Sequence, residues 1–308
     1  MKFAEPVYRP PMEANSLLLP VTQSCNWNKC NFCYRLKDYP FLVTTPEDLE
    51  QEILSQRAFY PPTTDIFLVG SNTFVLPVRK FREFFAVIRK YYPQNSSKTG
   101  KVSMFSRVDA IADKSDADLK ELRELGVSHL YVGTENGNDE ALELMNKGHN
   151  AAESVEQLKR LDAAGISYTL FYIIGMGGKG AGEKSARETA ALFNQVHPVR
   201  IVSTGMTVTE GTGAAKLQEE GLFVQASERE KIEELRLFLQ ELTVDTFYDG
   251  IHYLNPLHYR FQNSDAAAKK KILADIDAIL EKYSDSELEA AINRRQMEED
   301  CKPVQLQN

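Results

Sequence analysis

Residues 17–35 read LLLPVTQSCNWNKCNFCYR. The apolar run at the start of this stretch predicts a buried strand, and Cys25, Cys30 and Cys33 would lie on the loop that leaves its carboxyl end. Three thiols on one short loop cannot all pair as disulfides, whereas the C-x4-C-x2-C spacing supplies three thiolates for one metal centre. Iron–sulfur clusters are held by thiolates at about this spacing, normally by four of them. A cluster held by three thiolates leaves one iron open to an outside ligand, so the loop favours a chemical role over a purely structural one.

Two other interpretations of the cysteines remain open. A structural zinc ion would need a distant fourth ligand, for which the sequence offers His149, His252 and Cys301. Structural zinc usually uses two separated cysteine pairs, and only one cluster is present here. A thioredoxin-like redox role for the last two cysteines of the loop would leave the first one without a task. The iron–sulfur interpretation is therefore favoured.

The composition is that of an ordinary globular protein of 308 residues, with 43% hydrophobic and 26% charged residues. We find no apolar run long enough for a membrane span and no charged-then-apolar amino terminus, so neither a membrane protein nor a secreted protein is expected. Four cysteines, three of them clustered, suit a metal site in a reducing compartment and predict a cytoplasmic location. The net charge of −8 argues against nucleic acid as the main partner.

Strands and helices alternate regularly as far as about residue 210. Short apolar segments predict six strands, at 17–22, 65–70, 101–106, 129–135, 167–175 and 199–206. Helical periodicity fills the intervals, and Thr45 before Pro46 is a suitable cap for the first helix. This order predicts a parallel sheet covered by helices, either doubly wound or rolled into a full or partial barrel.

The remainder of the chain has a different pattern. Ser227 and Glu230 form a capping box for a strong helix, and the aromatic segment 247–263 reads as irregular. Charged helices are expected at about 264–283 and 285–299. We therefore divide the chain into three expected parts: a lead-in at 1–16 that runs extended over the surface, a core barrel at 17–215, and a helical region at 216–308 packed on the barrel.

Each predicted strand ends in polar or flexible residues, and the carboxyl ends of parallel strands meet at one edge, where such folds carry their sites. Besides the cysteines, these ends carry Gly70-Ser71-Asn72, Ser106-Arg107, Glu135-Asn136-Gly137 and the run from Gly175 to Gly178.

The cysteine loop resembles the cluster-binding loop of the radical S-adenosylmethionine (radical SAM) superfamily, and the resemblance extends over about residues 17–215. The family's usual spacing is C-x3-C-x2-C with an aromatic residue before the last cysteine. Phe32 stands at that aromatic position, whereas the gap between Cys25 and Cys30 is one residue longer. The resemblance implies an α/β fold, a partial (β/α)6 TIM-like barrel with a helical carboxyl-terminal extension. It also implies that the three cysteines bind a [4Fe–4S] cluster whose open iron binds S-adenosylmethionine (SAM).

By the same resemblance the chain is an enzyme that cleaves SAM reductively and generates a 5′-deoxyadenosyl radical, which abstracts hydrogen from a substrate. Such an enzyme is oxygen-sensitive and needs an electron donor such as flavodoxin or ferredoxin. No nucleic-acid-binding appendage is evident, so a small-molecule substrate is expected instead of transfer RNA. A second cysteine cluster and a cobalamin-binding segment are also missing from the pattern.

The resemblance assigns cofactor contacts to eight residues: Phe32, Gly70, Ser71, Asn72, Ser106, Glu135, Ile174 and Gly175. Phe32 would lie near the adenine, the segment 70–72 near the methionine amino group, and Glu135 at the ribose or carboxylate end. Backbone groups around Gly175 would bind the adenine. The ordinary alternatives are a Gly-Ser-Asn turn at 70–72 and a helix cap near Asn138.

Three side chains are candidates for catalytic residues that contact the substrate. Arg107 is suited to a carboxylate, either of SAM or of the substrate, and a surface ion pair is the alternative. Tyr172 and His252 are the other two candidates, and His252 belongs to an aromatic segment that would equally suit a packed tail.

Two further functions fit the loop. One is a binding or regulatory protein that carries an iron–sulfur cluster or zinc without turnover. The other is a hydratase-like use of the open iron as a Lewis acid, with the substrate carboxylate bound near Arg107.

Overall fold

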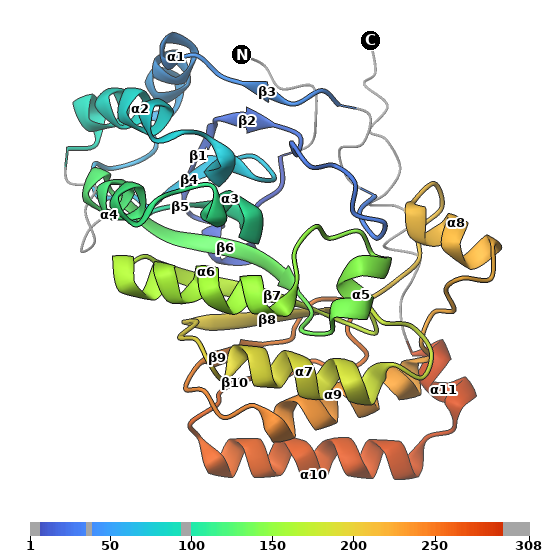
Figure 1. Ribbon diagram of the computed structural model, residues 1–308. Helices are drawn as coiled ribbons and strands as arrows, with labels where there is room; N and C mark the ends of the chain where they lie inside the picture. The colour runs from blue at the N-terminus through green and yellow to red at the C-terminus, as the bar shows by residue number, and fades with distance from the viewer. Residues whose placement is uncertain (1–6, 35–38, 94–99, 292–308) are drawn as a thin grey trace. The chain divides into compact units, whose positions relative to one another are not determined.

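The computed structural model describes residues 7–34, 39–93 and 100–291. Its main sheet has eight strands in the order β1-β4-β5-β6-β7-β8-β9-β10 (Figure 1). The strands are β1 (Leu17–Pro20), β4 (Ile66–Val69), β5 (Val102–Arg107), β6 (Val127–Glu135), β7 (Ser167–Ile174), β8 (Arg200–Gly205), β9 (Phe247–Asp249) and β10 (Arg260–Gln262). The first six match the predicted strands closely, and the α/β class with a mostly parallel sheet is confirmed.

The chain forms two compact units, and each is described by itself. The first unit contains residues 1–28, 36–134 and 152–170. Its helices are α1 (Pro46–Gln56), α2 (Val78–Tyr91), α3 (Val108–Ala112), α4 (Asp116–Leu125) and α6 (Ala151–Ala164). Two single turns, η1 (Pro11–Glu13) and η2 (Thr73–Val75), and the short strands β2 (Thr22–Gln23) and β3 (Leu42–Val43) complete it. In Figure 1, α1 and α2 lie next to each other within this unit.

Local sequence signals explain the helices of the first unit. The Thr45 hydroxyl accepts a hydrogen bond from the Asp48 N–H and so caps α1, as predicted. The apolar positions of α2 at helical spacing, which include Phe81, Phe85 and Ile88, are all buried. Gly126 closes α4 in the left-handed conformation that favours glycine.

The expectation that the lead-in runs extended over the surface is wrong for the part that the structure describes. Residues 11–13 form η1, and the Glu13 carboxylate is buried in the first unit. It accepts hydrogen bonds from the hydroxyls of Ser16 (2.5 Å), Ser103 (2.7 Å) and Tyr131 (2.6 Å). These three hydrogen bonds replace the hydration that the carboxylate loses on burial. A charged residue is therefore tolerated here. Residues 1–6 lie outside the described part.

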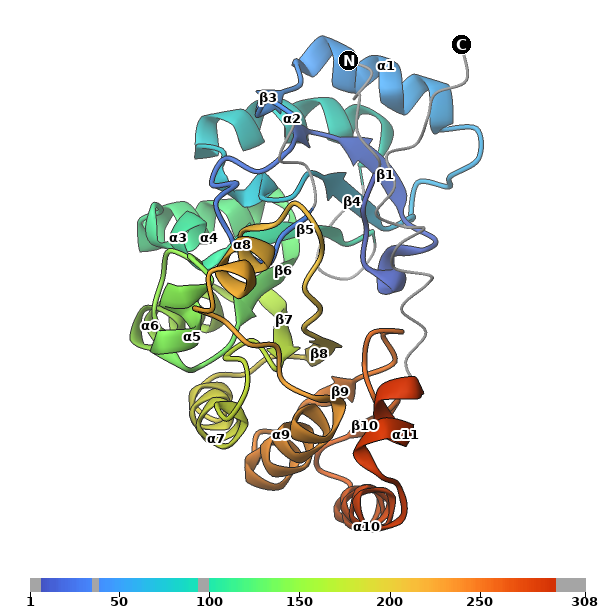
Figure 2. The same cartoon turned by 90° about the vertical axis from the view of Figure 1, so that its right-hand side faces the viewer.

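The second unit contains residues 29–35, 135–151 and 171–308. Its helices are α5 (Asp139–Leu144), α7 (Gly182–Phe193), α8 (Gly213–Glu219), α9 (Glu228–Glu241), α10 (Ala266–Lys282) and α11 (Asp285–Ala290). Figure 2 views α7, α9 and α10 nearly end-on, side by side. The predicted capping box of Ser227 and Glu230 is present at the start of α9. The expected helix at 285–299 is described only as far as the end of α11.

One expectation for the second unit is corrected. The aromatic segment 247–263 is not irregular throughout, because β9 and β10 pair antiparallel and β9 extends the sheet beside β8. The segment 209–221 contains α8, which the Thr212 hydroxyl caps. The boundaries at residues 16 and 215 stay predictions.

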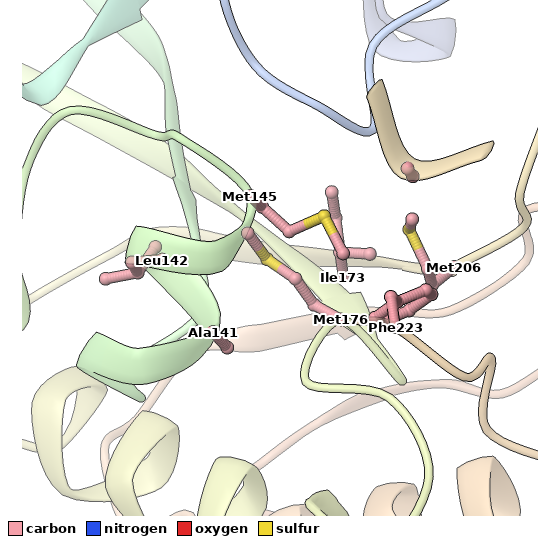
Figure 3. Packing of buried hydrophobic residues seen from close by; sticks show 8 residues of the cluster. Ala141, Leu142, Met145, Ile173, Met176, Met206 and Phe223 are labelled. Atoms are coloured by element: carbon pink, nitrogen blue, oxygen red, sulfur yellow. The ribbon is translucent and has the colours of Figure 1, made fainter. Parts of the chain in front are cut away.

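A sulfur-rich apolar cluster fills the second unit near the ends of β7 and β8. Figure 3 shows methionines of this cluster gathered near Ile173. The buried members are Ala141, Leu142, Met145, Ile173, Met176, Met206, Ala214 and Phe223. Phe32 packs against them, so the predicted aromatic neighbour of the last cysteine has an apolar support.

In the described ranges, no helix has both the length and the apolar character that crossing a membrane requires.

Candidate cofactor site

Gly70, Ser71 and Asn72 follow β4 in the first unit. Gly70 has φ +147°, and a Cβ at this position would lie 1.9 Å from the Thr22 hydroxyl oxygen. Glycine is therefore required here by packing against β2, whether or not a cofactor approaches its backbone. Asn72 is fully buried, and its amide is engaged at both ends: Nδ2 donates to Asn26 Oδ1 (2.7 Å), and Oδ1 accepts from the Arg107 N–H (3.0 Å).

Ser106 and Arg107 end β5 beside Asn72. The Ser106 hydroxyl donates to the Arg107 carbonyl oxygen (2.9 Å). The Arg107 side chain is 4% exposed, and its Nε donates to both carboxylate oxygens of Asp109 at 2.9 and 3.2 Å. Its guanidinium carbon lies 4.8 Å from the centre of the Trp27 ring. Arg107 thus does not form an ordinary surface ion pair, because its side chain is buried. Through its contact with Trp27 it holds part of the cysteine loop.

The part of the cysteine loop in the second unit is anchored through Asn31. Its N–H donates to the Met145 carbonyl oxygen (2.9 Å), and its Nδ2 donates to that of Leu144 (2.7 Å). Its own carbonyl oxygen accepts from the Ala214 N–H (2.8 Å) at the start of α8. A tight turn links the Cys33 N–H to the Cys30 carbonyl oxygen (3.2 Å). These bonds fix the backbone between the last two cysteines.

Phe32, Glu135 and Lys147 come together in the second unit. Lys147 Nζ lies 3.0 Å from Glu135 Oε1 and 5.8 Å from the centre of the Phe32 ring. The side chains of the ion pair are 5% and 12% exposed for Lys147 and Glu135, respectively. Two predicted cofactor residues therefore share one buried cation. Lys147 was not predicted, because a single lysine after a short helix carries no pattern in the sequence.

Glu135 also has an unusual backbone. Its φ is +66°, in the left-handed region that a residue with a side chain enters at a cost of about 1–2 kcal/mol. The ordinary alternative, a helix cap, is carried out by Asn138, whose Oδ1 accepts from the Ala141 N–H (2.8 Å). Glu135 is thus not needed as a cap, and its carboxylate pairs with Lys147. In the same segment, Asn136 Nδ2 is buried without a hydrogen-bond partner.

Tyr172 lies at the outer face of β7, where it packs against Phe193 of α7 and Phe238 of α9. It is fully buried, and its hydroxyl donates to Glu234 Oε1 (2.6 Å). Burial raises the pKa of Tyr172 well above its ordinary value. This environment favours a structural role for the Tyr172 ring over contact with a substrate.

Ile174 and Gly175 stand at the end of β7. Ile174 is fully buried, and its carbonyl oxygen accepts from the Met206 N–H (2.7 Å). The Gly175 N–H donates to Glu234 Oε2 (3.0 Å). Gly175 has φ +80°, and an added Cβ would lie 3.0 Å from Lys231 Cγ. The left-handed backbone therefore favours glycine at this position, and an added side chain would also have to displace Lys231 of α9.

Glu234 on α9 is the most strongly perturbed carboxyl near these residues. Burial raises its pKa from 4.5 to about 7, against the opposing effects of the Tyr172 and Gly175 hydrogen bonds and of Lys231. The neighbouring Lys231 is itself buried and pairs with Glu228 at 2.7 Å.

We expect the Glu234 carboxyl to make stability depend on pH. Because its pKa is higher in the folded chain, the folded state keeps a proton that the unfolded state releases between pH 4.5 and about 7. The stabilisation is complete below pH 4.5 and is lost as the pH rises through 7, with a total change of about 3 kcal/mol. Urea unfolding at several pH values across this range measures the slope.

Glu234→Gln should remove this part of the slope. Glu241→Gln, at an exposed ion pair on the same helix, is the control and should keep the wild-type slope. An unchanged slope in Glu234→Gln would show that another group titrates.

His252 lies between β9 and β10 and is half-buried. Its Nδ1 lies 3.0 Å from the Thr204 hydroxyl oxygen and accepts from the Leu254 N–H at 3.2 Å. Acceptance at Nδ1 assigns the proton of a neutral ring to Nε2. The His252 ring also stacks on Tyr253, with centres 4.5 Å apart. His252 is therefore held in one orientation.

The donor set fits a thiolate-held cluster in its chemistry. Cys25, Cys30 and Cys33 form no disulfide, and Cys30 is buried. Cys25 belongs to the first unit, and the other two belong to the second. Within the described ranges, no three His, Cys, Asp or Glu side chains are gathered closely enough to hold a metal ion. The metal centre thus stays a prediction that rests on the loop's sequence. For SAM, the buried Glu135–Lys147 pair offers both charges that a zwitterionic amino acid group requires.

Residues 19–193 match the model of the radical SAM superfamily, and this segment includes the whole cysteine loop. The chain belongs to the radical SAM superfamily, whose members are enzymes.

Two curated proteins illustrate the similarity. A tRNA-2-methylthio-N(6)-dimethylallyladenosine synthase from Hahella chejuensis is 30% identical over 118 residues, which are 38% of this chain and 25% of that protein. The synthase of the same name from Syntrophus aciditrophicus is 24% identical over 252 residues, 73% of this chain and 48% of that protein. The chain thus spans less than half the length of these curated relatives.

Among solved structures, the radical SAM methyltransferase TsrM from Kitasatospora setae has a TM-score of 0.52 at 15% identity. The match covers 66% of this chain and 36% of that one. Elp3 from Methanocaldococcus infernus has a TM-score of 0.50 at 13% identity and covers 85% and 64%. Both similarities support the fold alone.

Proposed function

We propose that this chain binds a [4Fe–4S] cluster through Cys25, Cys30 and Cys33 and uses it with SAM to abstract hydrogen from a substrate. When bound, these groups supply the reductive cleavage of a carbon–sulfur bond and a 5′-deoxyadenosyl radical. The observation that carries the proposal is the match of residues 19–193 to the superfamily, with all three cysteines inside it.

Lys147 and Glu135 are proposed to bind the charged groups of SAM. The buried Lys147 ammonium suits the methionine carboxylate, and Glu135 suits an amino group or ribose hydroxyls. Phe32, supported by the apolar cluster, offers a flat surface for the adenine. Charges held in a dry environment orient a ligand more strongly than exposed ones do.

The other predicted contacts act through backbone groups. Gly70, Ser71 and Ser106 lie at strand ends in the first unit, and Ile174 and Gly175 lie at a strand end in the second. The Asn72 amide already bonds Asn26 and Arg107, so its proposed role is to hold this edge in place.

For the substrate we propose a small molecule. His252, held with its proton on Nε2, is the candidate for contact with it. Arg107 is a weaker candidate, because Asp109 and Trp27 engage it. Tyr172 is the weakest, because it is buried between helices. The electron is proposed to come from a flavodoxin or ferredoxin, and oxygen sensitivity and a cytoplasmic location follow from such chemistry.

A nucleic-acid substrate is the second candidate, because the curated relatives are named as transfer-RNA-modifying synthases. The net charge of −8 speaks against it, since nucleic-acid binding depends on basic contacts to phosphates. Electrophoretic mobility of transfer RNA with the reconstituted chain, at low and at moderate salt, separates the candidates. A salt-dependent complex at micromolar concentrations of the chain would favour a nucleic-acid substrate.

Anaerobic reconstitution followed by reduction in the presence of SAM tests the function. We expect about four irons per chain and the formation of 5′-deoxyadenosine. The binding or regulatory alternative would be supported if the chain bound zinc instead of iron. It would also be supported if the absorbance and the reduced-state spectrum of the cluster did not change when SAM was added. Four irons without 5′-deoxyadenosine at any reductant would contradict the radical proposal.

A further inference from the structure

Trp27 is the one tryptophan in the sequence, and it lies in the four-residue segment between Cys25 and Cys30. The indole is half-buried, and the Arg107 guanidinium lies over its ring with 4.8 Å from carbon to centroid. Asp109 holds that guanidinium through Nε, and Arg107 is almost wholly buried. The contact is therefore a cation–π stack with an oriented partner.

A second contact fastens the neighbouring residue to the same place. Asn26 Oδ1 accepts from Asn72 Nδ2 (2.7 Å), and Asn72 Oδ1 accepts from the Arg107 N–H (3.0 Å). Asn72 and Arg107 stand at the ends of β4 and β5, all within the first unit. The chain thus closes a small ring of contacts, from Asn26 through Asn72 and Arg107 to Trp27.

The backbone on both sides of these contacts is bent. Ser24 has φ +64° and Asn28 has φ +49°, both in the left-handed region that non-glycine residues seldom enter. Cys25 lies between the first of these bends and the anchored pair. A segment with two sharp bends needs side-chain contacts to keep one conformation.

We propose that Trp27 is a positioning residue for the cluster. Its stack on Arg107, together with the Asn26–Asn72 hydrogen bond, holds the segment after Cys25 against the ends of β4 and β5 before iron binds. This inference rests on the proposed function, because it assigns Cys25 as a cluster ligand. It also gives the long first gap of the loop a purpose, since the added length contains the residues that fasten it.

The first arm of the test needs no metal. In the metal-free chain, Trp27 is the one indole fluorophore, and acrylamide quenching measures its exposure. Asn26→Ala alters an exposed residue and should leave the fold intact. We expect the quenching constant to rise about twofold in Asn26→Ala and more in Arg107→Gln, because each loses one anchor. Arg82→Gln, at an exposed ion pair with Glu121, is the control and should not change it.

The second arm measures how firmly iron is held. Trp27→Leu should release iron to a chelator about tenfold faster than the wild type, while Trp27→Tyr, which keeps a ring for Arg107, should stay within about threefold. Wild-type rates in Trp27→Leu, with unchanged quenching in Arg107→Gln, would overturn the inference. If the wild-type chain binds no iron, the proposed function fails, and the quenching arm alone decides whether Trp27 is anchored as described.

Discussion

Replacing Cys30 by serine is expected to leave the chain folded and unable to hold a cluster. Cys30 is 8% exposed, and serine is close to cysteine in size, so packing should survive the change. The serine hydroxyl does not ionise near neutral pH and is a poor ligand for iron compared with a thiolate. We expect iron to fall from about four to below about one per chain, and SAM cleavage to fall below about 1% of wild type.

Cys301→Ser is the matched control. Cys301 is the fourth cysteine of the sequence and lies outside the described residues, and we predict no role for it in the cluster. The control should keep wild-type iron and cleavage. Iron analysis with circular dichroism distinguishes loss of the ligand from loss of the fold. A folded Cys30→Ser chain with four irons and normal cleavage would mean that the ligand set is different.

Replacing Lys147 by methionine is expected to weaken both SAM binding and the fold. The change leaves the Glu135 carboxylate buried without its cation, which costs about 3 kcal/mol in the free energy of unfolding. It also removes the charge proposed for the SAM carboxylate, so the Kd for SAM should rise about 100-fold. Calorimetric titration of the reconstituted chain with SAM and urea unfolding measure the two effects.

A double variant separates the two consequences. Lys147→Met with Glu135→Gln removes both charges, so most of the lost stability should return while SAM binding stays weak. Lys184→Met, at an exposed pair with Glu140 in the same unit, should change either quantity little. Recovery of SAM binding in the double variant would assign Lys147 a structural role alone.

The sequence predicted the elements whose signals are local. All six predicted strands are present, because each is a compact apolar segment between polar turns. The caps at Thr45 and Ser227 are present for the same reason: each involves residues three positions apart. The superfamily could likewise be recognised from the spacing of three cysteines within nine residues.

Features that depend on distant partners were missed. Strands β9 and β10 are three residues each, too short for alternation to show. They form because they pair with each other and because β9 pairs with β8. The burial of Glu13 depends on Ser103 and Tyr131, about a hundred positions away. The contacts of Lys147 with Glu135 and Phe32 form only when loops fold, and so does the contact of Arg107 with Trp27. Loops carry no periodicity in the sequence that would predict these contacts.

Helix α9 has a consequence for any attempt to isolate a minimal enzyme. The Glu234 carboxylate of that helix accepts hydrogen bonds from the Gly175 N–H and the Tyr172 hydroxyl, and Lys231 fills the space beside Gly175. A chain shortened after Gly221 would leave that amide and that hydroxyl without their acceptor and uncover the rings beneath. The family match ends at residue 193, yet trimming to that limit would remove the support of β7. Inactivity of such a fragment would therefore report lost folding together with the removal of His252, and it would not by itself identify a catalytic group.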